Sequence, residues 1–317
     1  MPKNSTPAPA AAKTPESKPR KLKVPKYKSF KLQKKIQRSP DQALPSAFRL
    51  LWQTLGLFKS QWRVIALFLV VFASINLLVA QSAASPDDIN NLKTTFHDLS
   101  KGDWSQLGAS MALMVMLGTG SSQGSTATSY QLVWMVMGSL AFIWLLRELY
   151  ADNKPRIRDT FYKGMYPLVP FLLVLLMMGL QLLPAIIGGT VFSVLVSNGI
   201  ASTFAEQIAW GMACLLLGLV SLYWLSSSVF ALYISCLPNM TPLNALRSAR
   251  GLIEDRRGLV LRKVVYLPFA LFVIGALIMT PLVLFAPLGA VAMFFILNSV
   301  GLLVLHGYFY RLYRALL

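Results

Sequence analysis

Long apolar runs alternate with short polar connections along the chain from residue 45 onward. A helix needs about 20 apolar residues to cross roughly 30 Å of hydrocarbon. Six runs approach or exceed that length: residues 64–80, 130–146, 165–187, 208–236, 264–285 and 288–308. We therefore expect an all-α integral membrane fold with six transmembrane helices over residues 45–317. Only Ala286 and Pro287 separate the last two runs, which predicts a tight helical hairpin.

A seventh apolar run, residues 107–118, is too short to span a membrane. As a helix it would extend for only about 18 Å. We expect this segment to be an interfacial or re-entrant piece on the side of the membrane opposite the chain termini.

The distribution of Lys and Arg predicts the orientation of the six helices. The connections 147–164 and 237–263 are rich in Arg and Lys, whereas 188–207 contains no basic residue and 81–129 has more Asp than Lys. Basic connections favour the cytoplasmic side. The alternation predicts a multi-pass protein of the cell (cytoplasmic) membrane with both termini in the cytoplasm.

The first 44 residues differ in composition from the rest of the chain. Six prolines lie in residues 1–25, and few apolar residues are present to offset the entropy of ordering. We expect a disordered basic cytoplasmic tail that contacts anionic lipid or a protein partner. The candidate contacts are Lys21, Lys23, Lys26, Lys28, Lys34 and Lys35. Nucleic acid or ribosome contact fits the charge as well, but no recognisable nucleic-acid module follows.

Short amphipathic segments precede the first, third and fifth apolar runs. Ser46 can cap a helix ahead of the first run, and Thr241 with Pro242 can begin one ahead of the fifth. The third run is preceded by residues 155–167. We expect cytoplasmic interfacial helices here, and three repeats of an interfacial helix plus a helix pair. The charged face of the last one offers further lipid or partner contacts: Arg247, Arg250, Arg256 and Arg257.

The segment MTPLNALRSARGLIEDRRGLVLRK, followed by a Pro-bearing apolar hairpin, resembles a bacterial multi-pass family. This family is the membrane domain of glycerophosphodiester phosphodiesterase, together with its relatives of unknown function. The residues that carry the resemblance are Ala245, Leu246, Ser248, Arg256, Arg257 and Gly258. The resemblance implies a helical membrane domain over about residues 130–317. The chain contains no segment like the family's soluble catalytic barrel, so we transfer no catalytic residue.

Few side chains in the apolar runs carry chemistry. With two His and two Cys in the sequence, we expect neither a metal site nor a cofactor. No paired carboxylates or nucleophile–base motif are present, so we expect a non-enzymatic protein that organises lipids or partner proteins at the cytoplasmic face. The alternative is a transporter or lipid-translocating protein with a polar centre. Its candidate residues are Gln181, Ser226, Ser227, Ser228 and Asn298.

Overall fold

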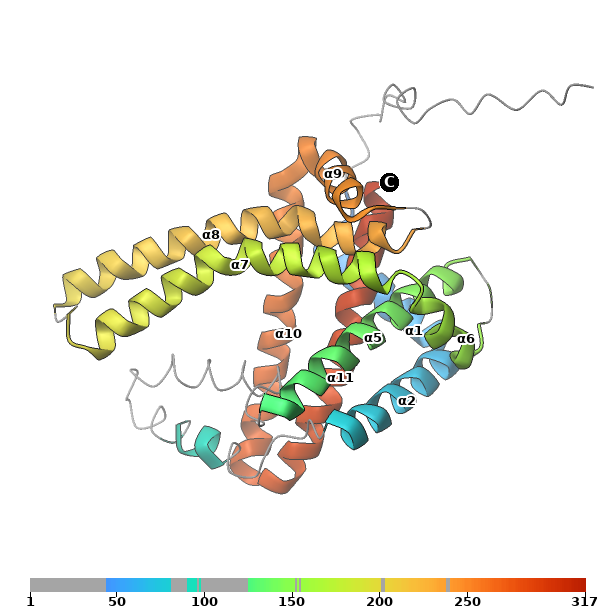
Figure 1. Ribbon diagram of the computed structural model, residues 1–317. Helices are drawn as coiled ribbons and strands as arrows, with labels where there is room; N and C mark the ends of the chain where they lie inside the picture. Colours follow the sequence, from blue (N-terminus) through green and yellow to red (C-terminus); the bar gives the residue numbers. More distant parts are fainter. Residues whose placement is uncertain are drawn as a thin grey trace, which may run out of the picture. The chain divides into compact units, whose positions relative to one another are not determined.

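The computed structural model describes residues 44–80, 90–95, 97, 125–151, 153, 155–200, 203–237 and 240–317. Every labelled element in these ranges is a helix (Figure 1). The elements are α1 (Ala47–Ser60), α2 (Trp62–Ala80), α5 (Ser125–Leu149), α6 (Ile157–Gly164), α7 (Leu168–Ser197), α8 (Phe204–Ser235), α9 (Pro242–Ile253), the 3-10 turn η2 (Glu254–Arg256), α10 (Arg257–Phe285) and α11 (Pro287–Leu316). The predicted tail up to residue 43 and the run 107–118 lie outside the described residues.

Five helical segments are long and apolar enough to cross a membrane. They are Tyr130–Leu149, Leu168–Val196, Ala205–Ser235, Pro242–Phe285 and Gly289–Leu316. These segments contain or largely overlap five of the six predicted runs. The first run lies in α2, which qualifies only together with α1, and the two helices meet at a bend of 91°. The predicted hairpin is confirmed, since Ala286 alone separates α10 from α11.

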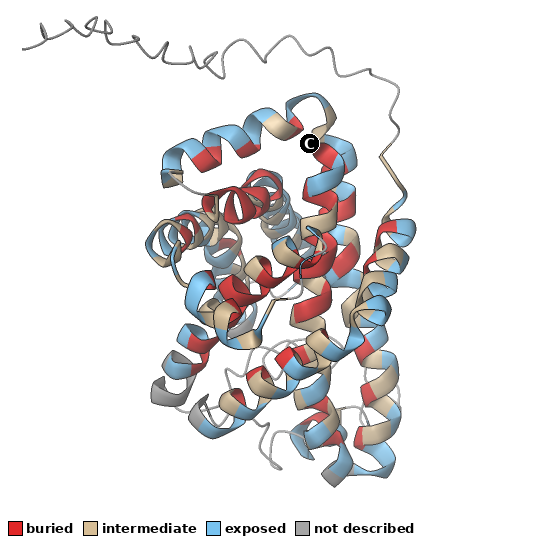
Figure 2. Cartoon of the chain, turned by 90° about the vertical axis from the view of Figure 1, so that its right-hand side faces the viewer, coloured by how far each residue is buried: buried red, intermediate tan, exposed pale blue. Residues whose placement is uncertain are grey.

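Two of the three short helices, α1 and α9, begin at the capping residues predicted from the sequence. The Arg49 N–H donates to Ser46 Oγ (3.3 Å), and the Asn244 N–H donates to Thr241 Oγ1 (3.4 Å). Pro242 occupies the first turn of α9, where its missing N–H removes no helical hydrogen bond. Figure 2 shows buried positions on one side of α9, at the top of the view. They are Ala245, Leu246, Ala249 and Ile253. These helices are therefore amphipathic, each with one face packed on the other helices.

α7 and α8 form a long antiparallel hairpin in which burial is concentrated at one end. Only 6% of the most apolar stretch of the α8 segment is buried, although Phe230 and Ala231 near its C-terminus are fully buried. Phe171 and Val174, at the start of α7, are buried beside them. The two helices run side by side in Figure 1, and their distal halves expose many large apolar side chains. Such a surface requires a lipid or protein environment.

The main core is built from residues of α1, α8, α9, α10 and α11, among other helices. It contains Leu50 of α1, Phe230 of α8, Ile253 of α9, Leu267 of α10 and Tyr308 of α11. A second cluster joins α2, α5 and α6 through stacked rings. The ring centroids of Phe68 and Phe161 are 5.4 Å apart, and those of Trp134 and Phe161 are 5.8 Å apart. These two cores bring the C-terminal ends of α5, α8 and α11 together.

Two glycines allow the short helices to approach the long ones closely. A Cβ on Gly164 of α6 would lie 2.8 Å from the Cα of Ala141 in α5. A Cβ on Gly307 of α11 would lie 2.7 Å from the Thr54 Cγ2 in α1. Arg311 adds polar contacts between α11 and α1, donating from Nε to the Gln53 Oε1 (3.0 Å). α1 and α6 are thus fixed tightly against the bundle.

Candidate functional site

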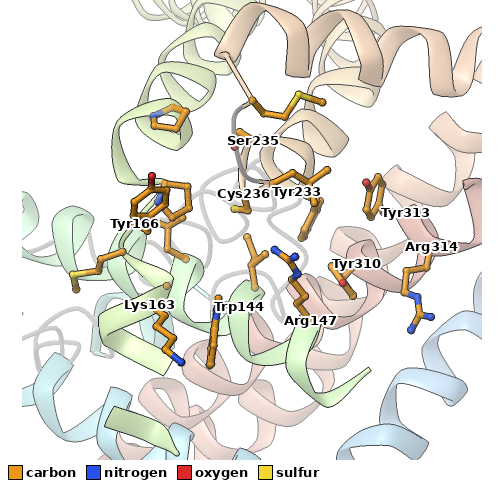
Figure 3. Close-up of a pocket in the computed structure, with 18 of the residues that line it drawn as sticks. Trp144, Arg147, Lys163, Tyr166, Tyr233, Ser235, Cys236, Tyr310, Tyr313 and Arg314 are labelled. Atoms are coloured by element: carbon orange, nitrogen blue, oxygen red, sulfur yellow. The ribbon is translucent and has the colours of Figure 1, made fainter. Parts of the chain in front are cut away.

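A cavity of about 1140 Å³ lies among α5, α6, α8, α11 and the connection between α6 and α7 (Figure 3). Its polar and aromatic lining consists of Trp144, Arg147, Tyr162, Lys163, Tyr166, Tyr233, Ser235, Tyr310, Tyr313 and Arg314. Ligand pockets in proteins measure about 300–1,000 Å³. This space is therefore large enough for a molecule of lipid-headgroup size together with part of its chain.

Three cations belong to the cavity lining, and Arg147 is the one that points into it (Figure 3). It is near enough to Cys236, Tyr310 and Tyr313 to act on them electrostatically. At the rim, Lys163 Nζ lies 5.7 Å from the centroid of the Trp144 ring, and the Arg314 guanidinium lies 4.5 Å from that of Tyr150. None of the described lining residues has an Asp or Glu side chain that could neutralise these charges. The cavity is therefore an electropositive space suited to an anion.

A buried hydrogen-bonded chain holds Tyr233 in the cavity wall. The Tyr233 hydroxyl lies 3.1 Å from His306 Nδ1, and His306 Nε2 lies 2.9 Å from Ser139 Oγ. The three side chains come from α8, α11 and α5, and all are buried. Since each buried polar group has a partner, the chain joins the three helices without the cost of unsatisfied groups.

The remaining lining of the cavity is apolar. Leu140 and Ile143 of α5, together with Pro167 and Pro170 at the start of α7, face the same space as Arg147. A cationic group beside an apolar wall matches a molecule with an anionic head and a hydrocarbon chain. It suits a fully polar anion less well, because the apolar wall offers such an anion no hydrogen bond.

A smaller cavity holds two of the arginines predicted from the sequence. Arg250 of α9 and Arg257 of α10 line a space of about 170 Å³ with Tyr223, Trp224 and Ser227 of α8. Arg247 is exposed on α9, and Arg256 is half-buried in η2; neither lines this space. The six tail lysines lie outside the described residues.

The five residues of the predicted polar centre do not lie together in the structure. Ser228 Oγ donates to the Gln181 Oε1 (2.7 Å), which joins α8 to α7. Ser226 and Ser227 donate to backbone carbonyls of their own helix. Asn298 instead lines a small gap with Gln131 of α5 and Ser299 of α11. The structure therefore brings Gln181 and Ser228 together but places Asn298 elsewhere.

The residues of the large cavity were not singled out from the sequence as one site. From the sequence, Arg147 counts only as one cation of the basic connection 147–164, and Arg314 has no assigned role. A usable signal was the aromatic residue three or four positions before each of them, Trp144 and Tyr310. That spacing places an aromatic ring and a cation on one helical face.

Comparisons with known proteins identify no relative. No protein-family model matches the chain, and neither a curated protein nor a solved structure shows significant similarity. The family resemblance described above therefore stays a prediction. Among the described residues, no group of three His, Cys, Asp or Glu side chains lies close enough to hold a metal ion.

Proposed function

We propose that this chain is a multi-pass protein of the cytoplasmic membrane that binds anionic lipid at its cytoplasmic face and thereby organises lipids or partner proteins there. The observation that carries the proposal is the large cavity. It combines Arg147, Lys163 and Arg314 with an apolar wall, at the ends of helices long enough to span a membrane.

The orientation follows from the distribution of charge. If the long helices cross the membrane in alternating directions, four basic residues fall on one side of it: Arg147, Lys163, Arg257 and Arg314. In contrast, residues 264–310, which include the connection between the last two long helices, contain neither Lys nor Arg. The positive-inside rule assigns the basic side to the cytoplasm. In this proposal α2 also crosses the membrane and brings the number of spanning helices to six. The helix α1 lies on the membrane surface, which fits the 91° bend between the two helices.

The assignment of the basic side to the cytoplasm also places the three short helices at the cytoplasmic face. α1, α6 and α9 each precede a long apolar helix and each packs one face on the bundle. We propose that they are interfacial helices of three repeated units, each made of one short helix and a pair of long helices. A basic tail at this face would add attraction to an anionic leaflet of about 1 kcal/mol for each cation close to the surface.

The geometry favours lipid binding over transport through the bundle. A transport path needs polar groups that face an accessible space, and Gln181 and Ser228 are instead bonded to each other. Asn298 adjoins a gap of only about 20 Å³. A transporter or lipid-translocating protein with a polar centre around Gln181, Ser226 and Asn298 stays the alternative function.

Photo-crosslinking with headgroup-labelled lipid tests the proposal. The full chain is reconstituted in vesicles that contain a diazirine-bearing phosphatidylglycerol analogue, irradiated, and mapped by peptide mass spectrometry. We expect adducts to concentrate in residues 140–147, 162–167, 233–237 and 310–317, because these segments line the cavity.

A control lipid and a control variant distinguish specific binding in the cavity from general contact with lipid. A phosphatidylcholine analogue with the same diazirine should give far fewer adducts in those four segments. Arg147→Gln should lower the anionic-lipid adducts, whereas Arg158→Gln, an exposed position of α6 outside the cavity, should leave them unchanged. Adducts distributed equally for both lipids over α7 and α8 would contradict the proposal.

A further inference from the structure

We propose that Arg250 and Arg257 form a second anion site, separate from the large cavity, which binds a single phosphate group. The site lies where α8, α9 and the start of α10 meet, and it does not depend on the function proposed above. The two cavities have no lining residue in common.

Arg257 is held in place as the main donor of this site. Its guanidinium lies 5.6 Å from the centroid of the Tyr223 ring, and its Nη1 donates to the Tyr223 hydroxyl (2.7 Å). An aromatic ring beneath a guanidinium fixes its plane and leaves its edge free for an acceptor. Tyr223 therefore orients Arg257 without neutralising it.

One donor of this arginine has no acceptor. The Arg257 Nε atom is buried and makes no hydrogen bond. A guanidinium binds phosphate through pairs of parallel N–H···O bonds. A phosphate oxygen in the adjoining cavity would supply the missing acceptor for Nε, with a small adjustment of the side chain. This unsatisfied donor supports an anionic ligand at the site.

The rest of the lining agrees with an anionic ligand. Arg250 contributes a second guanidinium, and the described lining residues include no carboxylate. Glu254 and Asp255 lie in the neighbouring turn η2, but both are exposed and neither lines the cavity. A site with two guanidinium groups and no facing acid favours a multiply charged phosphate over a carboxylate.

The size of the cavity limits the ligand to one phosphate group. Its volume of about 170 Å³ is well below the roughly 300–1,000 Å³ of sites for larger molecules. The phosphate can belong to a lipid headgroup or be free in solution. Trp224 and Tyr223 are exposed beside it, and such residues are typical of a membrane–water interface. The site is therefore open to either source.

The test measures phosphate affinity of the full chain in neutral detergent. The parent protein and all variants in this test carry Arg147→Gln, so that the large cavity contributes as little as possible to the measured phosphate binding. Binding of inorganic phosphate is measured by calorimetric titration, and binding of dihexanoyl phosphatidic acid by native mass spectrometry. We expect Arg250→Ala and Arg257→Lys each to weaken binding by about tenfold, the loss of one charge-assisted bidentate contact. Arg262→Ala removes an exposed charge from α10 outside the cavity and should change affinity by less than twofold.

Each outcome has a defined meaning. Loss of both ligands in the two variants supports a site for phosphate from either source. Loss of phosphatidic acid alone assigns the site to a lipid headgroup, and loss of inorganic phosphate alone assigns it to a soluble anion. Equal affinity of Arg250→Ala, Arg257→Lys and Arg262→Ala overturns the proposal, as does the absence of binding by the parent protein. The thermal unfolding midpoint of each variant shows that the fold is intact.

Discussion

His306 links three helices through the contacts of its side chain. Its two ring nitrogens contact Tyr233 of α8 and Ser139 of α5 inside the bundle. The imidazole belongs to α11 and is almost entirely buried. A residue in such a position affects stability through its partners as much as through its own contacts, because its loss leaves two buried hydroxyl groups unsatisfied.

We therefore expect His306→Ala to destabilise the folded protein. Interhelical hydrogen bonds in membranes contribute about 0.6 kcal/mol each, and an unsatisfied buried hydroxyl costs more, so the total loss should be about 1–3 kcal/mol. Thermal unfolding in detergent measures the change. Thr190→Val removes a hydroxyl of α7 that bonds only to its own helix, and it should have little effect. A His306→Ala variant as stable as the parent would show that the chain contributes nothing to stability.

Tyr233 connects this buried chain to the ligand cavity. Tyr233→Phe keeps the ring in the cavity wall but removes the hydroxyl that contacts His306. We expect a smaller loss of stability than for His306→Ala, together with anionic-lipid crosslinking close to that of the parent. Crosslinking reduced as far as in Arg147→Gln would instead make the hydroxyl itself a ligand contact.

At the scale of the helices, the approach of α6 to α5 depends on Gly164. Gly164→Ala would place a Cβ 2.8 Å from the Cα of Ala141, and backbone atoms cannot give way as a flexible side chain can. We expect a loss of about 1–3 kcal/mol, typical of overpacking. Anionic-lipid crosslinking should fall as well, because α6 forms one wall of the cavity.

Gly179→Ala provides the matched control for that substitution. A Cβ at Gly179 in α7 meets no atom within 4 Å, so the change should be neutral or slightly stabilising through helix propensity. If the two alanine variants unfold at the same temperature, the close contact between α5 and α6 does not limit stability.

Much of the element order could be predicted from local sequence. Apolar run length located the five helices that are long and apolar enough to span a membrane, and Ser46 and Thr241 located the starts of α1 and α9. These features depend on residues within a few positions of one another. The sequence placed Gln181 and Ser228 in one polar patch but did not predict that these two side chains contact each other. Asn298 was placed in the same patch although it packs on α5, because hydrophobic periodicity carries no information about which helices are neighbours.

The candidate site was less predictable for the same reason. Arg147, Tyr233 and Arg314 lie on three helices that are far apart in the sequence. Each residue alone has the character of an interfacial anchor at a helix end. Only the packing of α5, α8 and α11 through His306 brings them to one cavity.

For the whole molecule, the proposed topology makes a prediction that labelling can check. In a variant without Cys214 and Cys236, single cysteines are introduced as Asn153→Cys and Asn198→Cys. Both positions are exposed, one after α5 and the other after α7. A membrane-impermeant maleimide applied to intact cells should label position 198 at once and position 153 only after permeabilisation. The reverse pattern would contradict the cytoplasmic assignment of the cavity.

The central claim is that the cavity around Arg147 holds an anionic lipid. Native mass spectrometry of the full chain, extracted gently from its own membrane, tests it most directly, with Arg147→Gln and Arg158→Gln measured in parallel. We predict that the parent and Arg158→Gln retain one defined class of anionic lipid, and that Arg147→Gln retains at least tenfold less of it. Equal retention in all three proteins, or a parent that carries only zwitterionic lipid, would contradict the account.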